Sequence, residues 1–99
     1  MATTIRTEDI DLAEVLSALG HPVRLEIARA LSDDTEHPCG GIVEGISKST
    51  LTHHWKVLRS AGVINQRPHG RENLLSLRRA DLDERFPGFL DSILPHAGQ

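Results

Sequence analysis

The side chains best suited to chemistry in this sequence are hydrogen-bonding groups that recur along residues 47–61. If this segment is helical, one face carries Ser49, Thr52, His53, Lys56 and Ser60. Short hydroxyl and imidazole groups beside ammonium groups are suited to contact base edges and phosphates in the major groove of duplex DNA. The alternative is a solvated polar face without a partner. For His53 the flanking donors favour the contact with DNA.

The opposite face of the same segment is apolar and would hold the helix against a core. Leu51, Trp55 and Leu58 recur at i, i+4 and i+7, flanked by His54 and Ala61. Because Trp55 lies on this apolar stripe, we predict that it is a core residue rather than a platform for stacked bases. His54 is expected to be a half-buried histidine with a hydrogen-bond partner.

The ends of this helix and the residues after it predict a β-hairpin next to it. Ser47 is a suitable N-cap, and Gly62 is placed to be the left-handed residue just past the helix. The sequence then predicts strands over Val63–Arg67 and Asn73–Leu77, joined by the turn Pro68–Arg71. A helix followed by a hairpin is typical of a winged helix-turn-helix.

Positive charge is concentrated in the part of the chain that contains this helix and hairpin. The net charge is −3, but residues 46–79 carry seven basic side chains and one acidic side chain. Residues 1–45 carry three basic and nine acidic side chains, and residues 80–99 carry one basic and four acidic ones. Arginines and a histidine occur along the predicted hairpin, namely Arg67, His69, Arg71, Arg78 and Arg79. This distribution favours a phosphate backbone as the partner, with a solvated basic face as the alternative.

Length and composition indicate one small domain. A chain of 99 residues buries about two thirds of the surface that it exposes when unfolded, so burial against a second subunit would help its stability. The sequence contains no long apolar run and no export signal at its start, so we expect a soluble, cytoplasmic protein without a membrane partner. The single cysteine, Cys39, excludes a framework of intramolecular disulfides and favours a reducing compartment.

Helices are predicted on both sides of this central part. The first runs over residues 8–19, between the cap Thr7 and the stop Gly20, and the second starts at Pro22 and ends near Ser32. A short third helix, predicted over Cys39–Glu44, would complete a helix-turn-helix over residues 39–61, with the wing at residues 63–78.

The last predicted helix, residues 80–95, has a long apolar stripe and is expected to be interrupted. Pro87 predicts a kink, or a fresh start with this proline in the first turn. Two apolar terminal helices on so small a domain predict a two-fold interface, although packing within one subunit is the alternative. The residues predicted to form this dimer interface are Leu12, Leu16, Phe86, Phe89, Leu90 and Ile93.

The chain resembles the ArsR-type winged helix-turn-helix transcriptional repressors. The resemblance rests on residues 19–27, which read LGHPVRLEI, on residues 47–64, which read SKSTLTHHWKVLRSAGVI, and on Gly70-Arg71 in the predicted wing. It covers about Leu16 to Leu77. It implies a homodimer joined through its first and last helices, with the helix after Ser47 in the major groove.

The metal sites of that family do not carry over to this sequence. Thiol-type metal sensors of the family use a pair of cysteines, whereas this chain has only Cys39 in that region. Another type of metal site needs a histidine on the last helix, where this chain reads Asp81-Leu82-Asp83. We therefore expect no cofactor and no metal that controls DNA binding, with a scattered site at His37 and Cys39 as the less favoured alternative. No phosphate-binding glycine loop or paired catalytic carboxylates occur, so no enzyme is predicted.

These observations predict a mainly α protein with a small β-hairpin, about five helices and a two-stranded wing in one domain over residues 1–99. The predicted function is sequence-specific binding of double-stranded DNA by a homodimeric repressor that an unknown signal releases. The alternative is a winged-helix module for protein assembly. The residues predicted to contact DNA are Lys48, Ser49, Thr50, Thr52, His53 and Lys56 from the helix and Arg67, His69 and Arg71 from the wing.

Overall fold

The computed structural model describes residues 5–40 and 42–97. Within them the chain forms five α-helices, two short 3-10 helices and a three-stranded antiparallel sheet. The elements are η1 (Thr7–Asp9), α1 (Leu12–Leu19), α2 (Pro22–Ala30), β1 (His37–Pro38), α3 (Lys48–Ala61), β2 (Ile64–His69), β3 (Glu72–Leu77), α4 (Arg79–Arg85), α5 (Phe89–Ile93) and η2 (Leu94–His96). The predicted mainly α fold with a hairpin wing is confirmed.

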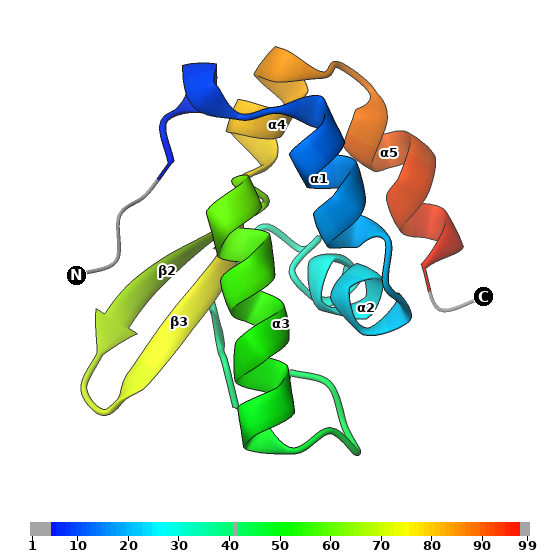
Figure 1. The fold of residues 1–99 in the computed structure, drawn as a ribbon. Helices are drawn as coiled ribbons and strands as arrows, with labels where there is room; N and C mark the ends of the chain where they lie inside the picture. Colours follow the sequence, from blue (N-terminus) through cyan, green and yellow to red (C-terminus); the bar gives the residue numbers. More distant parts are fainter. Residues whose placement is uncertain (1–4, 41, 98–99) are drawn as a thin grey trace.

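Helix α3 lies at the centre of the molecule, and its local sequence sets both of its ends (Figure 1). The Ser47 side chain accepts a hydrogen bond from the backbone N–H of Thr50 at 3.3 Å. Gly62 follows the helix with φ +89°, the left-handed conformation that closes helices. Trp55 is 5% exposed and lies in the core, as predicted.

Strands β2 and β3 form the wing, which extends away from the helices (Figure 1). Their register runs from Ile64↔Leu77 to His69↔Glu72, so the loop consists of Gly70 and Arg71. This loop is shorter than predicted, and Gly70 supplies the positive φ (+62°) that such a turn needs at its first position. Pro68 therefore lies in β2, an edge strand, where its missing N–H costs no ladder hydrogen bond.

The prediction of a helix over Cys39–Glu44 was wrong. Its described residues form bends and turns, and the chain before them pairs with the wing as β1, with His37 opposite Leu75. The Cys39 N–H continues this pairing by donating to the Asn73 carbonyl at 3.0 Å. Gly40 and Gly45 make helix formation costly here, and Gly45 has φ +80°. The wing sheet accordingly has three strands, in the order β1-β3-β2.

The first predicted helix starts later than expected. Residues 7–9 form η1, and Ile10 is extended and fully buried. Asp11, rather than Thr7, caps α1 by accepting from the Glu14 N–H at 3.2 Å. The spacing of apolar residues alone predicted one helix from residue 8. Burial of the extended Ile10 instead separates η1 from α1.

The predicted break near Pro87 is present. Helix α4 ends at Arg85, and α5 begins after Gly88, which has φ +80°. Pro87 lies before α5 instead of in its first turn. Gly88 makes the turn into α5, because its left-handed conformation is costly for any residue with a side chain.

The core joins all five helices to the base of the wing. Val15, Ile27, Leu58, Leu82 and Leu90 come from one helix each, and all are fully buried. The N-terminal segment is tied to α4 by three hydrogen bonds: Thr7 to Asp81, Arg78 to the Ile5 carbonyl and Arg85 to the Ile10 carbonyl, each 2.7 Å long. Across residues 5–40 and 42–97, no helix has the length and apolarity that crossing a membrane requires.

Candidate nucleic-acid interface

The predicted reading face of α3 faces solvent. Lys48, Ser49, Thr50, His53 and Lys56 are exposed, and Thr52 is half-buried. Two of the hydroxyls already donate or accept within the helix. The Thr52 hydroxyl donates to the Lys48 carbonyl at 2.8 Å, and Ser47 donates to the Thr50 hydroxyl at 2.9 Å. Thr52 therefore has only its acceptor lone pairs free for a partner.

A groove of about 630 Å³ separates α3 from the wing and brings part of the predicted site together. Its lining contains Lys48, Thr52 and Lys56 from the helix and Arg71 from the hairpin loop. Further residues that the sequence did not single out for this site are Cys39, Gly40, Trp55, Arg59, Gln66, Glu72 and Asn73. The wing and the helix thus present cations to one shared space.

A second hollow, of about 300 Å³, lies between α3 and α1 and is bordered by His53 and by Lys56, which also lines the groove beside the wing. Glu14, Ser17 and Ser60 lie in the same lining. His53 therefore lies at the side of α3 that turns toward α1, outside the lining of the groove beside the wing. The prediction of DNA contacts treated the two sides of the helix as one surface.

Arg67 of the wing is held by an internal partner. Its Nε and Nη2 both donate to the Glu36 carboxylate, each at 2.8 Å. This forked hydrogen bond raises the pKa of Arg67 and lowers the pKa of Glu36. Glu36 directly precedes β1 and lies in the segment between the second and third predicted helices. Arg67 is thus engaged by an acid of its own chain, whereas Arg71 lines the groove beside α3.

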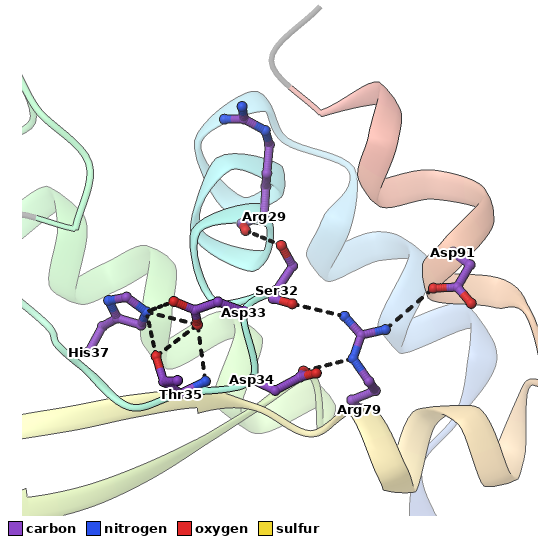
Figure 2. A network of polar contacts seen from close by, with 8 residues as sticks. All are labelled: Arg29, Ser32, Asp33, Asp34, Thr35, His37, Arg79 and Asp91. Carbon is purple, nitrogen blue, oxygen red and sulfur yellow. Dashed lines mark hydrogen bonds and ion pairs between the residues drawn. The ribbon is translucent and has the colours of Figure 1, made fainter.

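Two more arginines near the end of the wing hold the fold together. Arg78 is 5% exposed, and its Nε donates to Asp81 at 2.9 Å. Arg79 donates to Asp34 at 2.7 Å, to the Ser32 carbonyl at 3.2 Å and to Asp91 at 3.4 Å, as Figure 2 shows. These hydrogen bonds tie the loop after α2 to α4 and α5. The positive charge counted along the sequence therefore overstates the charge that a partner can reach.

The same loop contains a second polar cluster at its outer side (Figure 2). The Asp33 carboxylate interacts with the His37 ring at 2.9 Å and accepts from the Thr35 N–H at 3.0 Å. These hydrogen bonds, with that of His37 first, lower the pKa of Asp33 to about 2. The His37 ring is thereby engaged by a carboxylate. Among the described residues, no three His, Cys, Asp or Glu side chains are arranged to hold a metal ion.

The residues predicted to form a dimer interface divide into two groups. Leu12 and Leu16 of α1 are 42% and 51% exposed, so part of their apolar surface is uncovered in the single subunit. Phe86, Phe89 and Ile93 are partly buried against the core. The sixth residue, Leu90, is completely buried inside its own subunit and belongs to the core. The prediction that Leu90 belongs to the dimer interface was wrong. The apolar residues of α5 face both the core and the surface, and Leu90 is on the side that faces the core.

An apolar groove lies beside the exposed leucines. It has a volume of about 280 Å³ between α1, α2 and α5. Its lining residues are Leu16, Leu19, Gly20, Leu25, Phe89, Ser92, Ile93 and His96. Most of these side chains are apolar, in contrast to the groove beside the wing.

Comparisons with known proteins agree with this arrangement. Residues 19–67 match a protein family described as a helix-turn-helix domain. The chain is 34% identical over 94 residues to the uncharacterized HTH-type transcriptional regulator YceK of Bacillus subtilis (strain 168), covering 92% of this chain and 94% of that protein. This likeness extends well beyond α3 and the wing.

Solved structures share the fold. The transcriptional repressor BigR from Xylella fastidiosa is 25% identical with a TM-score of 0.64, over 90% of this chain and 97% of that one. An ArsR-like transcriptional regulator from Rhodococcus sp. RHA1 is 24% identical with a TM-score of 0.62, over 86% of this chain and 87% of that one. The fold is that of the ArsR-like winged-helix regulators. With its helix-turn-helix, its wing and these relatives, the chain belongs to the helix-turn-helix transcriptional regulators, a family of DNA-binding proteins and not of enzymes.

Proposed function

We propose that this protein is a homodimeric repressor that binds a specific duplex operator with α3 in the major groove and the wing along the backbone. The observation that carries the proposal is the shared groove between α3 and the wing, where Lys48, Lys56 and Arg71 converge. Cations from two elements around one concave surface match a duplex, whose two strands present phosphates on both sides of a groove.

The proposed contacts divide into two classes. Ser49, Thr52 and His53 offer short polar groups that reach base edges, so they contribute to the choice of sequence. We assign phosphate contacts, which contribute affinity, to Lys48, Lys56 and Arg71, together with Thr50 and His69. Arg67 joins the second class only after it leaves Glu36.

A quantitative binding experiment tests this assignment. Duplexes are first selected from a random pool by the purified protein, and the enriched duplex is titrated at several salt concentrations. Arg71→Ala and Lys56→Ala should each weaken binding to all sequences and lower the slope of log affinity against log salt by about one. Thr52→Ala should instead change which sequence is preferred.

The competing interpretation makes a different prediction for the same experiment. A winged-helix module for protein assembly would bind duplexes weakly, without sequence preference. If Arg71→Ala and Lys56→Ala both left affinity and salt slope unchanged, the docking would be abandoned.

The proposed dimer uses the apolar surface of α1 and α5. Leu12 and Leu16 would pack with Phe86, Phe89 and Ile93 against the same residues of a second copy, which is the self-complementary arrangement of a two-fold interface. Two half-sites one helical turn apart in the operator would follow from this symmetry. The signal that releases the repressor would act by favouring a dimer geometry that no longer fits those half-sites.

A further inference from the structure

A chain of three polar side chains connects the reading helix to both strands of the wing. Arg59 of α3 donates through Nη1 to the Oε1 atom of Gln66 in β2. Gln66 in turn donates through Nε2 to the Oδ1 atom of Asn73 in β3 at 2.8 Å. All three residues line the groove beside the wing. We call this chain the Arg59–Gln66–Asn73 relay.

The relay lies where apolar packing between the wing and the helices gives way to polar contact. On the inner face of the hairpin, Ile64, Leu75 and Leu77 are buried. Gln66 pairs with Leu75 and Asn73 pairs with Pro68, so the two amides continue this face toward the tip, and both are half-buried. Beyond the relay, Arg67, His69 and Arg71 are exposed.

The helix end of the relay is firmly anchored. The Arg59 guanidinium carbon lies 5.6 Å from the centroid of the Trp55 ring, and Trp55 itself is 5% exposed. A guanidinium over an aromatic face gains cation–π attraction, and its planar fork leaves it few orientations. The position of Arg59 is thus set by the core, and the relay transmits that position to the hairpin.

From these contacts we propose that Arg59, Gln66 and Asn73 are positioning residues that fix the angle of the wing to α3, and thereby the width of the groove that receives DNA. The inference rests on the proposed docking. His69 lies three residues beyond Gln66, or about 10 Å along the strand, so a rotation of about 10° at the relay displaces the tip by about 2 Å. A displacement of this size breaks a hydrogen bond from Arg71 to a phosphate.

The first test asks whether the relay and the wing tip act as a unit. Affinities for a fluorescein-labelled duplex of mixed sequence are measured at low salt for the wild type, Gln66→Ala, Arg71→Ala and the double variant. Arg71→Ala should weaken binding about tenfold in the wild-type background and less than about twofold in the Gln66→Ala background. Equal losses in both backgrounds would overturn the proposal, because a residue that only stabilises the fold leaves the Arg71 contact intact.

The second test does not depend on DNA. Residual dipolar couplings of backbone amides report the orientation of β2 and β3 relative to α3 in the free protein. One rigid orientation should fit the wild type and the control Asn65→Ala, whose side chain lies on the opposite face of β2. In Gln66→Ala the couplings of the hairpin should shrink relative to those of α3. Unchanged couplings would contradict the proposal, even if Arg71 does not touch DNA.

Two further variants separate the relay from charge and from folding. Arg59→Lys keeps the positive charge but lacks the planar fork, so it should loosen the hairpin as Gln66→Ala does. Asn73→Ala removes only the outer hydrogen bond and should have a smaller effect in the same direction. If Arg71→Ala alone has no effect on binding while the hairpin couplings still shrink in Gln66→Ala, the docking fails and the relay stands.

Discussion

At the scale of single residues, His54 shows how a side chain on the apolar stripe of α3 is accommodated. It is 6% exposed, and its Nδ1 lies 3.4 Å from Nη1 of Arg24. The rings of His21 and His53 lie 4.5 and 5.5 Å from its own, centroid to centroid. Burial, followed by the charges of His21, Arg24 and His53, lowers the pKa of His54 below its ordinary value of 6.5. The fold therefore favours the neutral ring.

The pKa of His54 predicts a decline in stability on the acid side. Because the folded chain binds this proton less readily than the unfolded chain, His54 costs nothing well above pH 6.5 and lowers the free energy of unfolding as the pH falls through this value. Urea unfolding at a series of pH values measures the effect. In His54→Asn this part of the pH dependence should disappear, whereas the control His69→Gln, on the exposed wing, should retain it. An unaltered profile in His54→Asn would assign the decline to other groups.

Glu36 gives a second prediction at this scale. Because the Glu36 carboxylate accepts hydrogen bonds from Nε and Nη2 of Arg67, Glu36→Gln should free this arginine for a phosphate. We expect DNA affinity to rise several-fold and the salt slope to steepen by about one unit. Glu72→Gln removes the same charge from the wing and should leave the slope unchanged. The prediction would be contradicted if the gain persisted in the double variant Glu36→Gln, Arg67→Ala.

At the scale of elements, the sequence predicted best where the signals are local. Ser47 and Gly62 flank α3 as expected, because a capping hydroxyl and a left-handed glycine act on their immediate neighbours. Strand β1 was missed because its partner Leu75 lies far along the chain. Ile10 delayed the start of the predicted first helix for the same reason, since its burial depends on distant residues.

In the candidate site, too, local features were predictable from the sequence and long-range contacts were not. The periodicity of α3 predicted which of its side chains face solvent. It did not show that Arg67 and Arg79 have acidic partners, because the fold brings Glu36 and Asp34 to them from distant parts of the chain. The relay had a weak signal in the sequence: Gln66 and Asn73 are amides on a hairpin face that is otherwise apolar near its base.

The end of α3 gives a prediction about stability. A Cβ atom at Gly62 would lie 2.7 Å from Cγ1 of Ile10, and the backbone there has φ +89°. Gly62→Ala should therefore lower the free energy of unfolding by about 2 kcal/mol or more, from backbone strain and from displacement of Ile10. The control Gly40→Ala has no atom within 4 Å of the new Cβ and should change stability little. Equal midpoints in urea for both variants would be inconsistent with this packing.

At the scale of the whole molecule, the proposed dimer is open to a direct test. Leu16 is 51% exposed at the edge of the apolar groove, so Leu16→Asp should place two unpaired charges inside a two-fold interface. Sedimentation equilibrium should give a dimer mass for the wild type and a monomer mass for Leu16→Asp. Asn65→Asp adds the same charge on the wing and should remain dimeric. A monomeric wild type at micromolar concentration would contradict the prediction.

The hydrogen bonds between the N-terminal segment and α4 also affect how the protein matures during synthesis. Thr7, Ile5 and Ile10 find their partners 74, 73 and 75 residues later. While the ribosome is still adding those residues, Ile10 remains exposed to water, and η1 lacks its contacts with α4. Contacts of such long separation form late, so folding should be completed only after most of the chain has emerged. Chains released before Arg85 should consequently be degraded much faster by a protease than the full chain.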